Sequence, residues 1–383
     1  MSLANQDAST RGAGDEGLSA EQAAARLAAL REQIDQIDRQ LVALLNERAK
    51  VVVEVGTIKR QTGSQAIYSP DREQAVLENI KRLNQGPLHD KTLVAVYKEL
   101  MSGSFALEKP LKIVYLGPDG SFSHLAARQQ FGSSVEYVPV RDIASVFDWI
   151  ERGHADYGLV PIENTTGGSI TDTLSKFLNT TVTVCAELAI PVHQNLLANC
   201  PMAEIERVYS KPQVFDQCRV WLAHNLPRAE LVDMASTTAA TQRAASEAHA
   251  AAIGSELAGE LYGVQAVYTA IEDNSQNLTR FLVIGREGPK PTGNDKTSLL
   301  FSVEDRHGAL VEVLRCFHDQ DINLSKIESH PSPLKKWEYI FFADIEGHRQ
   351  DERIRVALAG AREHCRQLGI LGSYPRGVQR DMD

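Results

Sequence analysis

The sequence predicts a multidomain fold in which an all-α region is followed by an α/β region and then by an α+β region. Apolar residues recur every seven positions near the N-terminus, which is typical of long packed helices. Strand-like and helix-like runs alternate through the middle of the chain, and a segment rich in glycine and proline, Gly288–Lys296, precedes a shorter mixed region. The length of 383 residues and the hydrophobic content of 43% suit two or three domains.

These changes of pattern predict a tail and three domains. We place the tail at residues 1–20, the helical domain at 21–108, the α/β domain at 110–287 and the α+β domain at 297–376. The tail lacks the apolar core of a signal peptide, so we expect it to be disordered.

The helical domain begins with one long helix. Pro70 suits the first turn of a second helix, and a third helix follows Gly86-Pro87 and runs towards Leu107. Three helices, one of them about forty residues long, cannot close a core alone, so we expect a homodimer or higher homo-oligomer that shares the long helix. The apolar residues that recur every seven positions on the long helix form its heptad seam. One row of the seam is Leu27, Ile34 and Leu41, and the other is Leu30, Ile37, Leu44, Val51 and Ile58.

The α/β region is expected to hold mostly parallel strands. Lys112–Leu116 is a short apolar strand, and a turn at residues 117–120 leads into a helix near Ser123–Phe131. About 175 residues is long for one such sheet, so we expect two lobes with a cleft. The alternation continues through Val135–Val138, Ile143–Glu151, Tyr157–Pro161, Ile170–Phe177 and Val182–Ala186, as far as a strand at Leu282–Ile284.

The C-terminal region follows the order βαββαβ of the ferredoxin-like split unit. The expected elements are a strand at Ser298–Val303, a helix at Ala309–Phe317, strands at Ile322–Ile327 and Tyr339–Ile345, a helix at Asp351–Gln367 and a last strand near Gly369–Tyr374.

Composition argues against several classes of function. The formal net charge of −10 disfavours nonspecific nucleic-acid binding, and no apolar run reaches the length of about eighteen residues that a membrane span needs. The eleven histidines form no HxxxH or HxH pair, so we expect no metal site. Walker and GxGxxG motifs are missing from the sequence, so no nucleotide cofactor is expected. The five cysteines are odd in number, widely spread and without a CxxC pair, which indicates a reduced, cytoplasmic protein.

One charged residue interrupts the heptad seam. Arg48 occupies a position where the pattern predicts an apolar side chain, and it either specifies helix register or provides a buried cation for an anion. Lys59 lies about 20° around the helix and roughly 16 Å along it from Arg48, so both can reach one ligand from the same face. Arg31 lies about 25 Å behind Arg48, which indicates that it serves a second site through a dimer.

The helical domain resembles the all-helical chorismate mutase domain. The resemblance rests on Leu30-Arg31-Glu32, Asp38, Leu41, Leu44-Leu45, Glu47-Arg48, Val55-Gly56, Lys59 and, at the start of the second helix, Asp71-Arg72-Glu73.

This resemblance implies a site for chorismate. Arg31 from the partner chain, Arg48 and Lys59 would hold the two carboxylates and the ether oxygen. Glu73 would bind the ring hydroxyl, with Arg72 supporting the site and Ser104 and Glu108 completing it. Lys59 and Glu108 would be the catalytic groups. The rearrangement of chorismate is intramolecular and needs no nucleophile, so cations and hydrogen-bond donors are sufficient.

Polar segments at strand ends mark the α/β region, at positions where such folds place ligands. Each segment alone also has a structural explanation, since glycines form turns and Ser236 and Thr237 are good helix caps. The segments are residues 117–123, Val160-Pro161-Ile162-Glu163-Asn164-Thr165, Ser236-Thr237-Thr238 and Asn277-Leu278-Thr279-Arg280-Phe281.

Together, and in this order, these segments resemble prephenate dehydratase over Lys112–Arg286. The resemblance implies two α/β lobes like those of type II periplasmic binding proteins. It assigns the catalytic role to Thr279, while Arg280 either grips a carboxylate or forms a structural ion pair. The implied substrate-binding residues are Glu163, Asn164, Thr165, Ser210, Gln213, Ser236, Thr237, Thr238, Thr279 and Arg280.

The C-terminal region resembles the ACT domains of this family. Gly308-Ala309-Leu310-Val311 matches the first effector motif, and Glu328-Ser329 matches the second, with His330 in place of the usual arginine. The implied ligand is phenylalanine, bound at an interface between two such domains.

The sequence thus predicts a bifunctional enzyme, an isomerase and a lyase, that converts chorismate to prephenate and then to phenylpyruvate under feedback inhibition by phenylalanine. An alternative is a non-catalytic amino-acid sensor with a dimerising helical domain. A second alternative is a dehydratase whose helical domain serves only as a scaffold. The complete set of Arg31, Arg48, Lys59, Arg72 and Glu73 speaks against both.

Overall fold

The computed structural model describes residues 19–61, 68–331 and 339–377, without the side chains of Arg60 and Glu108. It divides into two units, residues 1–62 and residues 63–383. The predicted tail lies outside the described residues except for its last two positions. Within the described ranges, no helix combines the length and the apolar character that crossing a membrane requires.

The first unit contains the long helix α1, Ala20–Gln61. This confirms the single helix predicted from the heptad repeat. The eight apolar side chains of the seam are 45–61% exposed, so the helix presents a continuous apolar stripe.

The second unit begins with two shorter helices, α2 at Pro70–Leu83 and α3 at Asp90–Glu108. Both were predicted, with Pro70 in the first turn of α2. Tyr68, which precedes α2, is 2% exposed and packs edge-on against Phe131 and Tyr157 of the following region. The Tyr157 hydroxyl also donates to the carbonyl of Tyr68 at 2.9 Å. The two helices are therefore fastened to the α/β region by a shared core.

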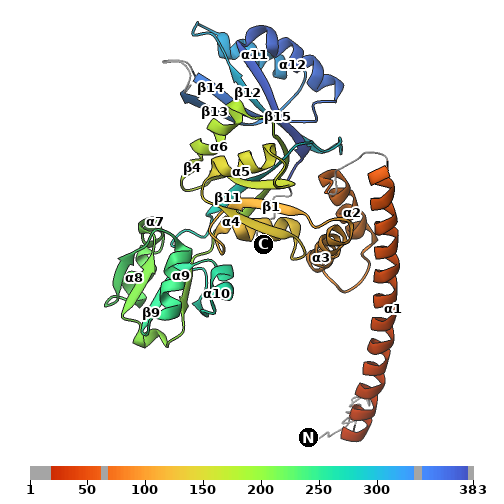
Figure 1. The fold of residues 1–383 in the computed structure, drawn as a ribbon, viewed down its shortest axis with the longest axis vertical. Helices are drawn as coiled ribbons and strands as arrows, with labels where there is room; N and C mark the ends of the chain where they lie inside the picture. Colours follow the sequence, from red (N-terminus) through yellow and green to blue (C-terminus); the bar gives the residue numbers. More distant parts are fainter. Residues whose placement is uncertain (1–18, 62–67, 332–338, 378–383) are drawn as a thin grey trace, which may run out of the picture. The chain divides into compact units, whose positions relative to one another are not determined.

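The first α/β lobe has a sheet with the order β2-β1-β3-β11-β5, and the short β4 pairs with β3. Helix α4 covers one face of this sheet and α5 covers the other (Figure 1). Ala126, Ala127 and Phe131 join the core on the α4 side, and Val146, Phe147 and Ile150 join it on the α5 side. The strands are β1 Lys112–Leu116, β2 Glu136–Val140, β3 Tyr157–Asn164, β4 Gly168–Ser169, β5 Thr183–Pro191 and β11 Leu278–Gly285, and the helices are α4 Phe122–Phe131, α5 Ile143–Glu151 and α6 Thr171–Lys176.

The second lobe is built on a five-stranded sheet with the order β10-β6-β9-β7-β8. Helix α9 lies against β9 (Figure 1). It also packs on β7, and Ala240 and Ala244 of the helix share a small core with Tyr209 and Ala252 of the two strands. The strands are β6 Asn195–Ala198, β7 Arg207–Ser210, β8 Glu230–Asp233, β9 Ala250–Gly254 and β10 Ala266–Tyr268, and the helices are α7 Pro212–Gln217, α8 Arg219–Asn225, α9 Thr237–Ser246 and α10 Glu256–Tyr262.

The expectation of mostly parallel strands is wrong, because both sheets are mixed. Parallel pairs join β1 to β2 and β3, and β7 to β8 and β9. Antiparallel pairs join β11 to β3 and β5, and β6 to β9 and β10. The chain leaves the first lobe along β5 and returns along β11, which therefore runs in the opposite direction beside it. An apolar run indicates burial and carries no information on strand direction.

Two segments connect the lobes, residues 192–194 after β5 and residues 269–277 before β11. They run side by side, since the N–H of Val192 donates to the carbonyl of Asn277 and the N–H of Ile271 donates to the carbonyl of Gln194, both at 2.8 Å. The two expected lobes are thus present and joined by a paired crossing.

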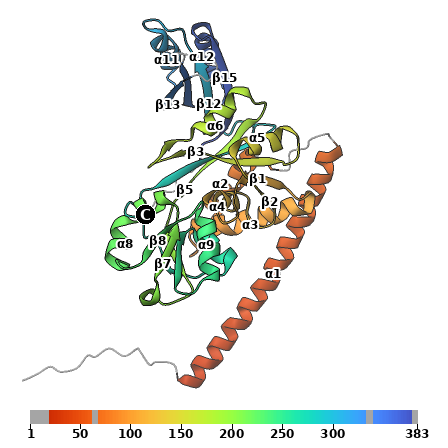
Figure 2. The ribbon, with the colours of Figure 1, turned by 60° about the vertical axis from the view of Figure 1, so that its left-hand side comes forward.

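The C-terminal region has the predicted βαββαβ order and an antiparallel sheet ordered β13-β14-β12-β15. Helices α11 and α12 lie side by side on one face of it (Figure 2). The other face shares a core with the first lobe through Leu300, Ile340, Phe342 and Tyr374. The elements are β12 Asp295–Ser302, α11 Ala309–His318, β13 Leu324–Pro331, β14 Tyr339–Glu346, α12 Glu352–His364 and β15 Gln367–Pro375, so the expected linker ends before Asp295 and α12 ends before the predicted Gln367.

Candidate active site

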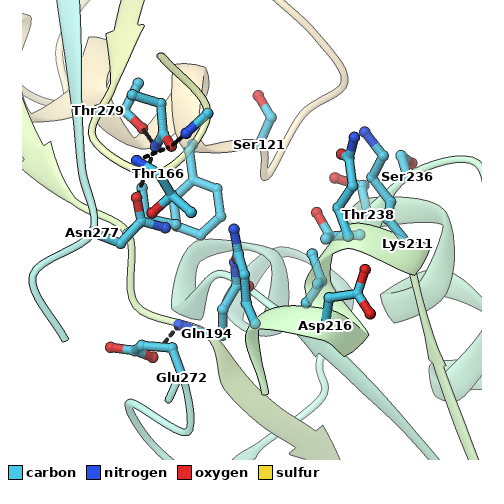
Figure 3. Close-up of a pocket in the computed structure, with 18 of the residues that line it drawn as sticks. Ser121, Thr166, Gln194, Lys211, Asp216, Ser236, Thr238, Glu272, Asn277 and Thr279 are labelled. Carbon is cyan, nitrogen blue, oxygen red and sulfur yellow. Dashed lines mark hydrogen bonds between the residues drawn. The ribbon is translucent and has the colours of Figure 1, made fainter. Parts of the chain in front are cut away.

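A cavity of about 880 Å³ lies between the two α/β lobes (Figure 3). This volume is within the range of about 300–1,000 Å³ that is usual for small-molecule sites. Its lining comes from strand ends and helix starts of both lobes and from the two crossing segments. The polar lining residues are Ser121, Asn164, Thr166, Gln194, Lys211, Gln213, Asp216, Gln217, Ser236, Thr237, Thr238, Glu272, Asp273, Asn274, Asn277 and Thr279.

The wall of the first lobe carries a hydrogen-bonded pair, Asn164 at the end of β3 and Thr279 near the start of β11. Antiparallel pairing sets these two residues opposite each other. The Asn164 amide nitrogen, Nδ2, donates to Thr279 Oγ1 and to Asn277 Oδ1, each at 2.8 Å. Asn164 Oδ1 accepts from the backbone N–H groups of Thr166 at 3.0 Å and Gly167 at 2.8 Å.

These contacts determine which way the Thr279 hydroxyl can act. The two backbone donors require the oxygen of the Asn164 amide on their side, so the NH₂ group must face Thr279. The Thr279 oxygen then accepts from Asn164, and its own hydrogen is left for a ligand in the cavity. Thr279 is 8% exposed, so this hydroxyl acts where little water competes.

The wall of the second lobe is formed by the start of α9 and the turn after β7. Ser236 caps α9, since its hydroxyl accepts from the N–H of Ala239 at 3.0 Å. The Thr238 hydroxyl donates to the carbonyl of Asp119 in the first lobe at 3.0 Å, which ties the two walls together. Figure 3 shows Ser236, Thr238 and Lys211 across the cavity from Thr279 and Asn277.

The crossing segments supply a buried carboxylate between the walls. Glu272 has a side chain only 2% exposed, and it pairs with His193 Nδ1 at 2.7 Å. Its second oxygen accepts from the N–H of Gln194 at 2.8 Å. The pair therefore joins the two crossing segments directly behind the cavity.

Six of the ten residues predicted for this site line the cavity: Asn164, Gln213, Ser236, Thr237, Thr238 and Thr279. Ser210 and Thr165 do not line it. The Ser210 hydroxyl is buried and donates to the carbonyl of Ile253 at 2.9 Å, and the Thr165 hydroxyl donates to the carbonyl of Gln276 at 3.2 Å. Both side chains hold the backbone around the cavity.

Glu163 and Arg280 point away from the cavity and towards the C-terminal sheet. Glu163 pairs with Lys326 at 2.8 Å, and Arg280 pairs with Asp344 at 2.7 Å and with Glu187 at 2.6 Å. Of the two roles left open for Arg280, the structure places it in an ion-pair network.

The sequence interpretation missed several lining residues, among them Thr166, Gln194, Lys211, Asp216 and Glu272. The sequence could have indicated Lys211, because this residue lies between the predicted Ser210 and Gln213. Gln194 and Glu272 stand in no recognisable motif and meet only because the crossing segments pair.

The residues predicted for the mutase site are divided between the two units. Arg31, Arg48 and Lys59 lie on α1, Arg72 and Glu73 on α2, and Ser104 on α3. The side chain of Glu108 lies outside the described residues. Glu73 Oε2 accepts from the Tyr68 hydroxyl at 2.8 Å and from Gln130 Nε2 at 3.2 Å. The pKa of Glu73 is raised, chiefly because the carboxyl group is buried. The charge of Lys98 and the hydrogen bond from Tyr68 lower the pKa by less than burial raises it.

The two predicted effector motifs lie in the C-terminal region. Gly308 has a φ of 81° and precedes α11, which begins at Ala309, so a residue without a Cβ suits this position. On β13, side chains alternate, so that Glu328 pairs with Lys326 and contacts the Ser169 hydroxyl while Ser329 is exposed. Leu310 and Val311 form the first turn of α11, and Val311 is 57% exposed.

The fold and cavity define a class: a multidomain protein with a helical region, a two-lobed α/β region that holds a cavity of ligand size, and a ferredoxin-like C-terminal domain. Three family models match the chain in this order, chorismate mutase type II at residues 30–109, prephenate dehydratase at 113–289 and the ACT domain at 297–360.

Relatives match over nearly the whole length. The bifunctional chorismate mutase/prephenate dehydratase of Aquifex aeolicus (strain VF5) is 42% identical over 357 residues, which cover 92% of this chain and 98% of the relative. The enzyme of the same name from Stutzerimonas stutzeri is 40% identical over 359 residues, with the same coverage. The crystal structure of prephenate dehydratase from Arthrobacter aurescens, in complex with L-Phe, has a TM-score of 0.64 and 32% identity over 70% of this chain and 90% of that chain.

The chain belongs to the family of bifunctional chorismate mutase/prephenate dehydratases. It is an enzyme with both activities, rearranging chorismate to prephenate and converting prephenate to phenylpyruvate. The predicted fold class and function are confirmed, and the alternatives of a non-catalytic sensor and of a purely scaffolding helical domain are set aside.

Proposed function

We propose that the cavity between the lobes is the prephenate dehydratase site and that Thr279 is its proton donor. The Asn164–Thr279 hydrogen bond carries this proposal, because it leaves the Thr279 hydrogen directed at a ligand. The dehydration consumes one proton, since the prephenate dianion becomes the phenylpyruvate monoanion, carbon dioxide and water.

Thr279 Oγ1–H gives its proton to the ring hydroxyl as the carbon–oxygen bond breaks, and water leaves. The electron pair of the bond to the departing carboxylate moves into the ring, which becomes aromatic as carbon dioxide is released. The oxygen of Thr279 keeps the hydrogen bond from Asn164 while charge develops on it, and solvent then restores its proton.

Three variants test this assignment. Thr279→Ala should lower dehydratase kcat by about 10²–10⁴, the usual contribution of a positioned acid, while mutase activity stays at the wild-type level. Thr279→Ser keeps the hydroxyl and should retain most of the activity, and Asn164→Ala should lower kcat by misorienting the hydroxyl. Full dehydratase activity in Thr279→Ala would show that the proton comes from another group.

For the mutase reaction, we propose a site made of Arg48, Lys59, Arg72, Glu73, Ser104 and Glu108, completed by Arg31 of a second copy. The exposed apolar stripe of α1 supports a homodimer or higher homo-oligomer, because burying eight such side chains against a second copy would stabilise it strongly. The catalytic groups in this proposal are Lys59 and Glu108.

We further propose phenylalanine as the effector of the C-terminal domain. Gly308, Ala309, Leu310 and Val311 would bind it together with Glu328 and Ser329. The complex of the Arthrobacter aurescens relative with L-Phe supports this proposal. Dehydratase activity should fall as phenylalanine is added, and a chain with Gly308→Leu should resist it.

The remaining assignments rest on sequence and burial. We propose domain limits of 21–108, 110–287 and 297–376, a cytoplasmic location and no nucleic-acid partner. The net charge of −10 supports the last of these. The five cysteines are unpaired, and burial raises the pKa of the Cys185 and Cys218 thiols to about 12, which suits small structural residues in a reducing compartment.

A further inference from the structure

Lys211 is the single lysine, arginine or histidine among the described residues that line the cavity. It lies in the turn between β7 and α7 of the second lobe, and Figure 3 places it across the cavity from Thr279. Within the described ranges of the chain its ammonium group has no ion-pair partner, although lysines elsewhere in this unit, such as Lys296 and Lys326, are paired at 2.8 Å.

The other charges at the cavity are negative and mostly already engaged. Glu272 is held by His193 and the N–H of Gln194. The carboxylate of Asp273 accepts from the N–H groups of Val220 at 3.0 Å and Trp221 at 3.2 Å. Asp216 is the third carboxylate. A dianionic substrate therefore meets one cation for its two carboxylates.

We propose that Lys211 binds the carboxylate of the pyruvyl side chain, the one that is retained in phenylpyruvate. The proposal deepens the assignment of the dehydratase site and rests on it. Prephenate carries its hydroxyl on the ring carbon opposite the one that bears both the pyruvyl group and the departing carboxylate. With the hydroxyl at Thr279, both carboxylates therefore lie towards the opposite wall, where Lys211 lies.

The direction of electron flow supports this choice. The charge of the departing carboxylate moves into the ring as carbon dioxide forms, so a cation paired with it would stabilise the ground state more than the transition state. A cation on the retained carboxylate keeps its partner throughout the reaction. It contributes to binding and orientation without opposing the chemical step.

The test compares Lys211→Met with Lys211→Arg and with Lys290→Met, an exposed lysine of the linker as the matched control. The measured quantities are dehydratase kcat and KM for prephenate and the inhibition constant of phenylpyruvate, which has only the retained carboxylate. Lys211→Met should raise KM and the phenylpyruvate inhibition constant together, by about tenfold to a hundredfold, the range for a lost hydrogen bond to a charged group. The effect on kcat should be much smaller, and Lys211→Arg should restore part of the binding of both ligands.

Two results would overturn the proposal. A higher KM for prephenate with unchanged inhibition by phenylpyruvate would mean that Lys211 binds the departing carboxylate. Unchanged values of both would mean that Lys211 contacts neither. Thr279→Ala distinguishes a wrong role for Lys211 from a wrong assignment of the dehydratase site. If Thr279→Ala is inactive while Lys211→Met binds both ligands normally, only the role of Lys211 is contradicted. If Thr279→Ala is fully active, the assignment of the dehydratase site is contradicted. Thermal unfolding of each variant verifies that Lys211→Met is folded.

Discussion

Arg280 Nη2 lies 2.7 Å from Asp344 Oδ2, and this ion pair joins the strand that carries Thr279 to the sheet of the C-terminal domain. Successive side chains of a strand point to opposite faces, so Thr279 faces the cavity and Arg280 faces β14. The same alternation on β3 sends Asn164 to the cavity and Glu163 to Lys326 of β13. Asn164 and Thr279 at the active site are therefore the direct neighbours, on the same two strands, of Glu163 and Arg280 at the contact with the C-terminal domain.

The Arg280–Asp344 pair should be important for stability, because both side chains are largely buried, at 18% and 8% exposed. Removing one member of a buried pair typically costs about 3–5 kcal/mol, since the other is left without its partner. We expect Asp344→Ala to destabilise by the lower part of this range, because Glu187 still pairs with Arg280. The midpoint of urea unfolding measures the effect.

A double substitution serves as the control for this pair. Arg280→Met combined with Asp344→Ala removes both charges, so the double variant should cost less stability than the sum of Arg280→Met and Asp344→Ala measured separately. Strict additivity of the three values would show that the two residues do not interact.

Ser236 combines two roles that one substitution can separate. It caps α9 and also lines the cavity. Ser236→Ala should lower stability by about 1 kcal/mol through the lost cap. If its hydroxyl also binds prephenate, dehydratase kcat/KM should fall by about a further tenfold.

Asp142→Ala is the matched control for Ser236→Ala. Asp142 caps α5 by accepting from the N–H of Ser145 at 2.7 Å, and it does not line the cavity. It should lose a similar amount of stability and keep its activity. Equal kcat/KM in the two variants would leave Ser236 as a cap only.

Some features of this fold follow from local sequence patterns, and others depend on contacts between segments that are far apart in the sequence. Helix α1 and the βαββαβ order were predictable, because periodicity reflects which face of an element is buried. Strand direction was not, since β11 pairs antiparallel with β3 and β5 only as a result of the long excursion into the second lobe. Thr279 and Asn164 were found through motifs. The orientation of Arg280 required knowing what packs against the far face of β11, and Glu272 required the pairing of two segments distant in the sequence.

Glu73 should make stability depend on pH. Its pKa is raised above the ordinary value of 4.5, chiefly by burial, so the folded state favours the neutral form. The raised pKa therefore contributes to the free energy of unfolding below pH 4.5, and this contribution is lost as the pH rises through the folded-state pKa. Glu73→Gln keeps an acceptor for the Tyr68 hydroxyl and carries no charge. We therefore expect it to be more stable than the wild type at pH 7, with the difference shrinking as pH falls.

Thermal unfolding from pH 5 to pH 8 measures this difference. Glu78→Gln, an exposed position on the same helix, is the matched control and should follow the wild type. A constant offset between wild type and Glu73→Gln across this range would contradict a titration of Glu73. Mutase activity of Glu73→Gln reports separately on its predicted contact with the ring hydroxyl of chorismate.

Arg31 is expected to act in the mutase site of a partner chain, because it lies about 25 Å from Arg48 along one helix. Heterodimers that combine one Arg31→Ala chain with one Arg48→Ala chain then hold one intact site and one site with both defects. Such heterodimers, isolated with two different affinity tags, should show about half of the wild-type mutase activity. The reciprocal heterodimer carries both substitutions on one chain and none on the other. If Arg31 acts across the dimer, each of its sites lacks one arginine and mutase activity is lost, whereas action within one chain would leave one site intact. Half activity in the reciprocal heterodimer, with none in the first, would therefore assign Arg31 to the site of its own chain.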